Sequence, residues 1–188
     1  ADRIPELYAY CSLAYGHPSV LFHGSFTLLS QEGVQQGDPI GPLLFCNTIH
    51  PLLLSLAAQL NLGYLDDISL GGPLDVVAAD VARIAHEGEE KGLYLNRSKC
   101  ELIAHPDLVI QNPVFQSFQR VDVQDASLLG APLFRGPSLD AAWSHRCEDL
   151  SRAIDRLKNI GSQEALTLLR ASFSAPRVLH LLRCSPSN

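Results

Sequence analysis

Short apolar runs alternate with breaking residues over the first 72 positions, and each run has the pattern of one element. Residues 19–30, "SVLFHGSFTLLS", are apolar and β-prone around His-Gly-Ser, which predicts a β-hairpin. Residues 31–42 are dense in glycine and proline, so we expect a loop. Residues 43–60 have the composition and length of a helix, which Pro51 is expected to kink or divide. Residues 63–72, "GYLDDISLGG", predict a strand, a tight turn and a second strand.

The middle of the chain changes from a helical period to short strands. Residues 74–91 predict a helix that ends at Gly92, with charge on one face. Residues 93–104 predict strand, polar turn and strand, and residues 127–134 a short β segment. The apolar stripe of the predicted helix consists of Val76, Val77, Ala79, Val81, Ile84 and Ala85.

Two helices are expected at the end of the chain. The first follows a Ser138 cap and runs to about Ile160, and the second follows a Ser162 cap and is broken near Pro176. Hairpins that alternate with helices predict an α+β fold in which an antiparallel sheet is backed by helices. A small helical segment follows this sheet.

Composition and charge narrow the class of protein. The 188 residues are 46% hydrophobic and 18% charged, which suffices for a buried core. We expect no membrane helix, because no apolar stretch without a breaker is long enough to span a bilayer. The five cysteines are widely spaced without a C-x-x-C pair, which favours reduced thiols in an intracellular protein of the cytoplasm or nucleus over a zinc site.

The most unusual chemistry lies in the predicted turn at Asp66 and Asp67. Two carboxylates on adjacent residues repel each other unless a cation is bound between them. A solvated turn is the simpler interpretation, because aspartate is a good turn residue. The motifs on either side of the pair favour the cation.

Three motifs occur in a fixed order, "EGVQQGDPIGPLLF", then "YLDD", then "GLYLNRSKCE". Together they resemble the reverse transcriptase (RNA-directed DNA polymerase) domain of the non-LTR, LINE-like retrotransposon type. The resemblance covers residues 22–101 and continues more weakly through "LLGAPL" and the last helices. It implies a partial polymerase palm over residues 1–136 and a helical thumb over residues 137–188. The family's first catalytic aspartate strand and its fingers are expected to lie outside this chain.

The resemblance also implies roles for residues of the first two motifs. Asp66 is expected to be the main ligand and Asp67 the supporting ligand of two Mg²⁺ ions, for which Mn²⁺ can substitute. Tyr64 and Leu65 are expected near the primer end. Gln36 and Gly37 are expected near the nucleotide sugar and the template base, in a loop whose turn into the next helix is set by Asp38, Pro39 and Pro42. An ordinary strand-to-helix loop is the competing interpretation.

In the third motif, the resemblance implies that Lys99 helps to neutralise or protonate the departing pyrophosphate, whereas a solvated turn lysine is the alternative. The implied partners are an RNA template, a DNA primer, deoxynucleotides and the remainder of the polymerase chain. Only Arg3 is basic among the first 82 residues, so any phosphate-binding surface is expected in the last third. The basic residues there include Arg146, Arg152, Arg156, Lys158, Arg170, Arg177 and Arg183.

Three other functions compete with an active polymerase. The first is a catalytically inactive retroelement remnant that at most binds nucleic acid or a protein. The second is another two-metal palm enzyme such as a nucleotide cyclase, but a GGDEF-type box is missing. The third is a serine hydrolase, for which no G-x-S-x-G elbow is present.

Overall fold

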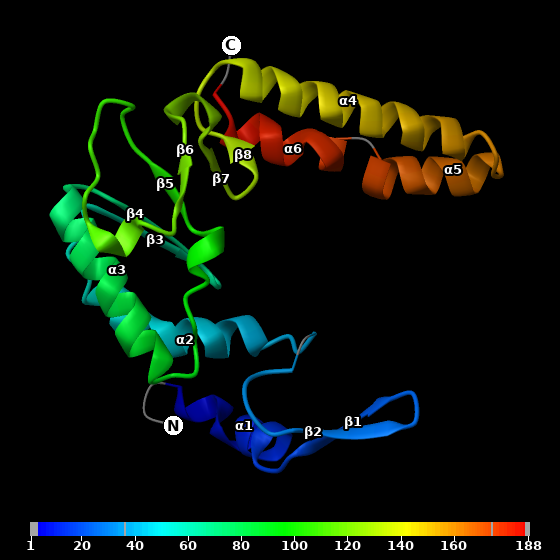
Figure 1. Ribbon diagram of the computed structural model, residues 1–188. Helices are drawn as coiled ribbons and strands as arrows, with labels where there is room; N and C mark the ends of the chain where they lie inside the picture. Colours follow the sequence, from blue (N-terminus) through cyan, green and yellow to red (C-terminus); the bar gives the residue numbers. More distant parts are fainter. Residues whose placement is uncertain (1–3, 36, 174, 187–188) are drawn as a thin grey trace. The chain divides into compact units, whose positions relative to one another are not determined.

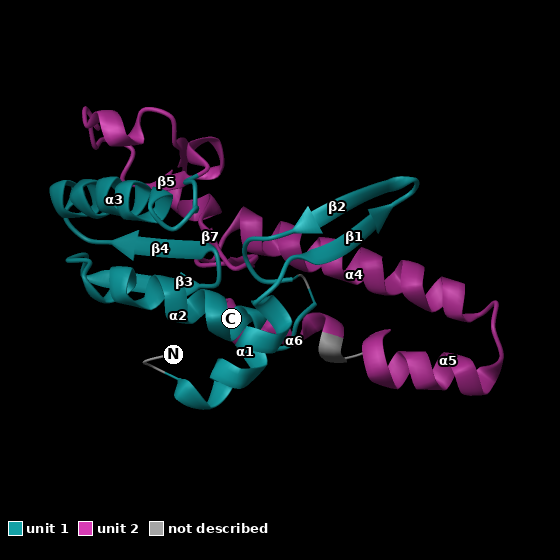
Figure 2. Cartoon of the chain, turned by 90° about the horizontal axis from the view of Figure 1, so that it is seen from below, with its two compact units in different colours: residues 1–95 teal, residues 96–188 magenta. Residues whose placement is uncertain are grey.

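The chain folds into two compact units, residues 1–95 and residues 96–188 (Figure 2). A computed structural model describes residues 4–35, 37–173 and 175–186. The expected boundary between residues 136 and 137 falls at the start of a long helix, whereas the compact units divide after Leu95. The division into palm and thumb therefore stays a prediction.

The elements follow each other as shown in Figure 1. The first unit contains a 3-10 turn Pro5–Leu7, α1 Tyr8–Tyr15, β1 Ser19–His23, β2 Phe26–Ser30, α2 Gly41–Leu54, β3 Leu60–Tyr64, β4 Asp67–Gly71 and α3 Leu74–Glu89. The second contains β5 Glu101–Ile103, β6 Gln119–Val121, β7 Ser127–Leu128, β8 Ala131–Pro132, α4 Pro137–Leu157, α5 Ser162–Leu168, a π-helical turn Leu169–Phe173 and α6 Ala175–Cys184, with 3-10 turns at Arg97–Lys99, Pro113–Phe115 and Val123–Asp125.

The strands form separate pairs. β1 with β2, β3 with β4, and β7 with β8 are antiparallel, and β5 with β6 is parallel. The mixture of helices and small sheets agrees with the α+β class. The expected single antiparallel sheet is not seen among the residues that the structure describes, because every sheet there has two strands.

The core of the first unit lies where α2, α3 and the β3–β4 hairpin meet. Ile49, Leu52, Ala78 and Val81 are buried there. A Cβ atom on Gly63 would stand 2.6 Å from Leu53 Cδ1, so a larger residue there would force the Leu53 side chain to shift.

Asp80 is a buried carboxylate within this core, with 5% of its surface exposed. Its oxygens accept hydrogen bonds from Ala57 N at 2.9 Å and from Ala58 N at 2.7 Å. Arg83 of the same helix donates to the Ser55 carbonyl at 2.9 Å. Side chains of α3 thus hold the corner where the chain leaves α2 and enters β3.

Two predictions for this region need correction. The helix expected over residues 43–60 passes through Pro51 undivided but ends at Leu54, because the corner is bound to α3 and the chain enters β3 at Leu60. In α3, the predicted stripe member Ala79 is exposed, while Ala78 and Asp80 are buried. The two hairpins and the helix from residue 74 are confirmed, although this helix ends at Glu89. The loop expected over residues 31–42 ends at Ile40, because α2 begins at Gly41.

Of the strand, polar turn and strand expected over residues 93–104, the first strand is wrong and the last is confirmed. Only Glu101–Ile103 forms a strand, and its partner is Gln119–Val121. Residues 97–99 form a 3-10 turn instead. Arg120 in β6 holds the loop that follows β5, since its guanidinium donates to the carbonyls of His105 at 2.8 Å and Leu108 at 3.1 Å.

The core of the second unit lies between the β7–β8 hairpin, α4 and α6. Ala126, Ala131, Leu139 and Leu181 are buried there. His180 Nε2 lies 2.9 Å from the Leu129 carbonyl, which ties α6 to the β7–β8 turn. The predicted β segment over residues 127–134 is thus confirmed as a small hairpin.

The helix starts of the second unit differ by one or two residues from prediction. Gly136, not Ser138, is the N-cap of α4, and Gly161, not Ser162, is the N-cap of α5. The Ser138 hydroxyl instead donates to Asp125. The break expected near Pro176 lies earlier, at the π-helical turn Leu169–Phe173, and Pro176 is part of α6.

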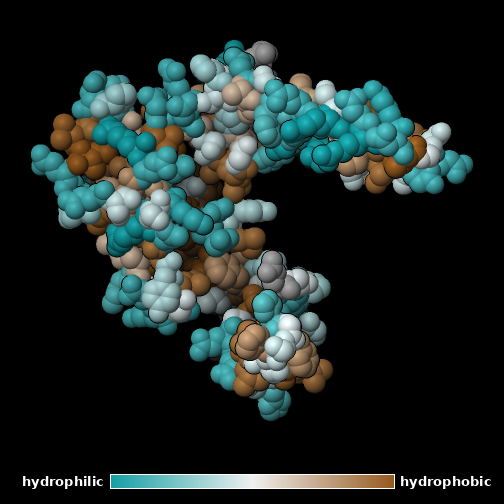
Figure 3. All heavy atoms as spheres, turned by 45° about the vertical axis from the view of Figure 1, so that its right-hand side comes forward, coloured by the Kyte–Doolittle hydropathy of each residue, from teal (hydrophilic) through white to brown (hydrophobic). Residues whose placement is uncertain are grey.

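The β1–β2 hairpin is apolar on both faces and largely exposed, as the brown atoms at the lower front of Figure 3 illustrate. Phe22 is 81% exposed and Phe26 70% exposed.

Among the described residues, no helix is long and apolar enough to cross a membrane.

Replacing Asp80 with alanine should lower the free energy of unfolding by about 1–3 kcal/mol, because two partly buried backbone N–H groups lose their acceptor. Chemical denaturation of the chain measures this change. Glu89→Ala, at an exposed site of the same helix, serves as the control and should stay within about 0.5 kcal/mol of the parent. Equal losses in both variants would contradict the anchoring role of Asp80.

Candidate active site

The carboxylates of Asp66 and Asp67 lie at the tip of the β3–β4 hairpin. Tyr64 pairs with Asp67 across the two strands, so Leu65 and Asp66 alone form the turn. Both aspartates and Tyr64 are exposed, and Leu65 is half-buried. The predicted turn is confirmed. In the described part of the chain, the hairpin is a two-stranded sheet by itself and not part of the larger antiparallel sheet that we expected.

The turn contains backbone strain at Leu65, whose φ is +53°. Hairpin turns favour glycine or asparagine at such a position. A leucine there costs about 1–3 kcal/mol, and the surroundings must impose it. The β3 strand supplies this constraint, because Asn61 Nδ2 donates to the Leu53 carbonyl of α2 at 2.6 Å and Gly63 packs on Leu53.

The aspartate pair has the donor chemistry of a magnesium site, since carboxylate oxygens are the ligands that Mg²⁺ prefers. It supplies only part of a ligand set. Within the described residues, no group of three or more His, Cys, Asp or Glu side chains could hold a metal ion. Asp66 and Asp67 thus fit as two ligands of a site that requires further donors.

The second predicted site is the loop that leads into α2. Gln36 lies outside the described residues. Gly37 has a φ of +93°, and a Cβ atom placed on it would meet nothing within 4 Å. The glycine is therefore required by its backbone conformation, and its open side leaves room for an approaching group.

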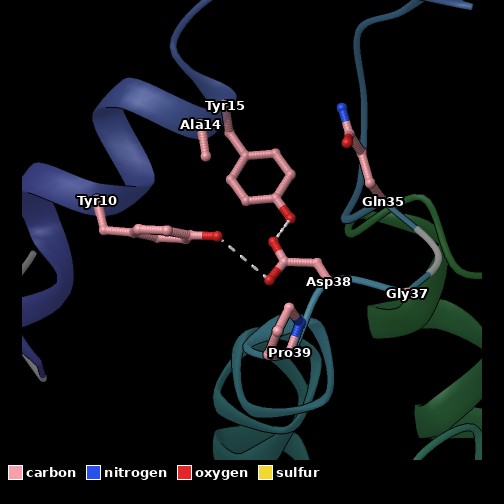
Figure 4. Close-up of a pocket in the computed structure, with 7 residues that line it drawn as sticks. All are labelled: Tyr10, Ala14, Tyr15, Gln35, Gly37, Asp38 and Pro39. Carbon is pink, nitrogen blue, oxygen red and sulfur yellow. Dashed lines mark hydrogen bonds between the residues drawn. The ribbon is translucent and has the colours of Figure 1, made fainter.

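Asp38 connects this loop to α1, and Figure 4 shows both tyrosines pointing at its carboxylate. The Tyr15 hydroxyl donates to Oδ2, and the Tyr10 hydroxyl lies 3.5 Å from Oδ1. Ile40 N donates to Oδ1 at 2.9 Å, and Gly41 N donates to the Asp38 carbonyl at 3.0 Å. Asp38 thereby sets the turn into α2.

These contacts favour the ionised carboxylate. The Tyr15 hydroxyl and then Ile40 N–H hold the pKa of Asp38 below its ordinary value. The same hydrogen bond to Asp38 raises the pKa of Tyr15. The contacts border an open hollow of about 360 Å³, lined by Tyr10, Ala14, Tyr15, Gln35, Gly37, Asp38 and Pro39.

The remaining predicted residues lie in the second unit, which is described by itself. Lys99 ends a 3-10 turn and is exposed. On α4, whose surface is mainly hydrophilic (Figure 3), Arg152 pairs with Asp149 and Lys158 pairs with Asp155 at 2.7 Å. Part of the expected basic surface is therefore neutralised by acids of the same helix, and its role with nucleic acid stays a prediction.

Sequence reasoning missed the roles of Tyr15, Tyr10 and Asp80. Tyr15 and Asp38 are 23 positions apart, and no local pattern links a helical tyrosine to an aspartate in the next loop. Asp80 offered one signal, because it interrupts an otherwise apolar stretch at Ala78–Val81.

No protein-family model, curated protein or solved structure matches this chain.

Replacing Tyr15 with phenylalanine should raise the pKa of Asp38 toward its ordinary value, because the largest cause of the lowered pKa is removed. A carbon-13 NMR titration of the Asp38 carboxyl group measures this shift. The lowered pKa stabilises the folded state above the ordinary carboxyl pKa, and this contribution is lost as the pH falls through the lowered value. Tyr15→Phe should therefore lose less stability on acidification. The control is Tyr8→Phe, also on α1, which should leave the Asp38 titration unchanged.

Proposed function

We propose that this chain is part of an RNA-directed DNA polymerase of the non-LTR retrotransposon type, with a palm over residues 1–136 and a thumb over residues 137–188. The observation that carries the proposal is the exposed pair Asp66 and Asp67 at the tip of a strained two-residue turn. The ordered motifs around this pair support it.

Nucleotidyl transfer requires a rigid set of carboxylates. When bound, two Mg²⁺ ions would stabilise the attacking primer oxygen and the departing pyrophosphate. Asp66 and Asp67 would hold these ions, or Mn²⁺, from a turn whose position is set by the packing of β3 on α2. Since neither side chain is buried, both oxygens of each are open to ligands.

The surroundings of the pair suit the other reactants. Tyr64 presents an exposed aromatic ring beside the aspartates, which suits contact with a primer nucleotide. Leu65 would lie near the primer end, and Gln36 and Gly37 would lie against the nucleotide sugar and the template base. Lys99 would neutralise or protonate the pyrophosphate. Such an enzyme copies RNA inside the cell, in the cytoplasm or nucleus.

The proposal requires the remainder of the polymerase chain. Two carboxylates alone bind a divalent cation poorly, and a third must come from outside the described residues. The 188-residue chain by itself should therefore show no primer extension.

A catalytically inactive remnant is the second candidate. It is favoured by the lack of a group of three metal-binding side chains among the described residues. Such a product would at most bind nucleic acid or a protein.

Titrating Mn²⁺ into the nitrogen-15-labelled chain should selectively broaden the amide signals of residues 64–68, because the paramagnetic ion relaxes only nearby nuclei. Asp66→Asn should weaken the effect more than Asp67→Asn, since an amide is a poorer ligand than a carboxylate. Asp75→Asn, at an exposed site of α3, is the control and should leave it unchanged. Broadening spread evenly over all exposed acids would contradict a site at the turn.

In the longer protein that carries this chain, Asp66→Asn should abolish primer extension on an RNA template, because the metal site loses its main charged ligand. Lys99→Ala should slow extension by about 10²-fold, the lower scale for general-acid catalysis. Incorporation of labelled deoxynucleotides measures both. Asp75→Asn should remain fully active, and full activity of Asp66→Asn would rule out the mechanism.

A further inference from the structure

The loop around Gly37 is held on both sides by long-range hydrogen bonds. On one side, Gln35 Nε2 donates to Ser19 Oγ at the start of β1, at 2.8 Å. On the other side, Tyr15 of α1 donates to the Asp38 carboxylate. Between these two points, the side of Gly37 where a Cβ would stand has no neighbouring atom within 4 Å. Packing against Gly37 therefore does not set its conformation, whereas Gln35 and Asp38 on either side are held by hydrogen bonds.

The bond from Tyr15 goes beyond what the turn into α2 requires. An aspartate that accepts from the N–H two residues later, as Asp38 does from Ile40, already forms a complete turn by itself. Tyr15 adds a contact from a different element, and it contacts the same carboxylate on its other oxygen. This contact fixes the direction of the side chain and, through the backbone, that of the preceding glycine.

The hollow beside the loop has the dimensions of a ligand site. Its volume of about 360 Å³ lies within the common range for small-molecule pockets. Two tyrosine rings, a proline and an open glycine backbone border it (Figure 4). Such a lining suits a flat base and a sugar that approaches the backbone closely.

We infer that Tyr15 is a positioning residue, whose hydroxyl acts through Asp38 to hold the Gly37 loop in the conformation that receives the incoming nucleotide. This inference rests on the proposed polymerase function. Tyr15 itself does not touch the reacting atoms. Its removal weakens nucleotide binding because the loop must then be ordered at the moment of binding, which costs free energy.

The first measurement is amide hydrogen exchange on the 188-residue chain. In the parent, Ile40 N–H and Gly41 N–H are bonded to Asp38, and Asp38 N–H is bonded to the Gln35 carbonyl at 3.1 Å. Tyr15→Phe should accelerate exchange at these three amides by about tenfold and leave the β3–β4 amides unchanged. Tyr8→Phe is the matched control and should exchange like the parent. Unchanged exchange in Tyr15→Phe overturns the inference.

The second measurement is steady-state primer extension by the longer protein that carries this chain. Tyr15→Phe should raise the KM for deoxynucleotides by about tenfold with kcat within twofold, because the loss falls on binding and not on the chemical step. Asp38→Asn should raise this KM less, since its amide oxygen still accepts from Ile40 N–H and its amide N–H group can donate to the Tyr15 oxygen. A fall in kcat without a change in KM overturns the inference.

The two measurements separate the inference from the proposed function. A longer protein without any extension activity overturns the polymerase and with it the nucleotide step. The exchange experiment still decides whether Tyr15 holds the loop. Faster exchange with an unchanged KM limits Tyr15 to a structural role and overturns its role in binding.

Discussion

The buried carboxylate of Asp80 is the interaction on which the first unit depends. It accepts the backbone N–H groups of Ala57 and Ala58, just where the chain reverses between α2 and β3. A charge is rarely buried unless its hydrogen bonds are satisfied, so this contact leaves little freedom in the path of the corner. The starting point of β3, and with it the position of the whole β3–β4 hairpin, follows from it.

The fixed position of β3 also constrains the turn at the tip of the β3–β4 hairpin. Gly63 lies against Leu53 of α2, and Asn61 bonds the same residue's carbonyl. Strands fixed at this end can impose a positive φ on Leu65, which the turn residues alone would avoid. The result is a pair of adjacent, exposed carboxylates in a defined place. A metal site needs this combination of rigidity and access.

The loop before α2 is also held in place by contacts with other elements, but these contacts are of a different kind. It has no buried charge. It is instead held by the exposed hydrogen bond that Gln35 donates to Ser19 and by the partly buried one that Tyr15 donates to Asp38. Bonds that compete with water contribute little stability each. The loop around Gly37 can therefore change its conformation at a small cost in free energy, which suits a site where a ligand must enter and leave.

The sequence by itself determined the local elements. Turn residues between apolar runs defined the hairpins at residues 19–30 and 63–72, and the apolar period defined α3, because these signals act over a few neighbouring residues. It also placed Asp66 and Asp67 at an exposed tip. Only the tertiary structure decided that residues 101–103 pair with residues 119–121, that α2 ends at Leu54, and that Asp80 and the Tyr15–Asp38 contact fix the two loops. These outcomes depend on hydrogen bonds between positions 16 to 28 residues apart, and only folding brings such partners together.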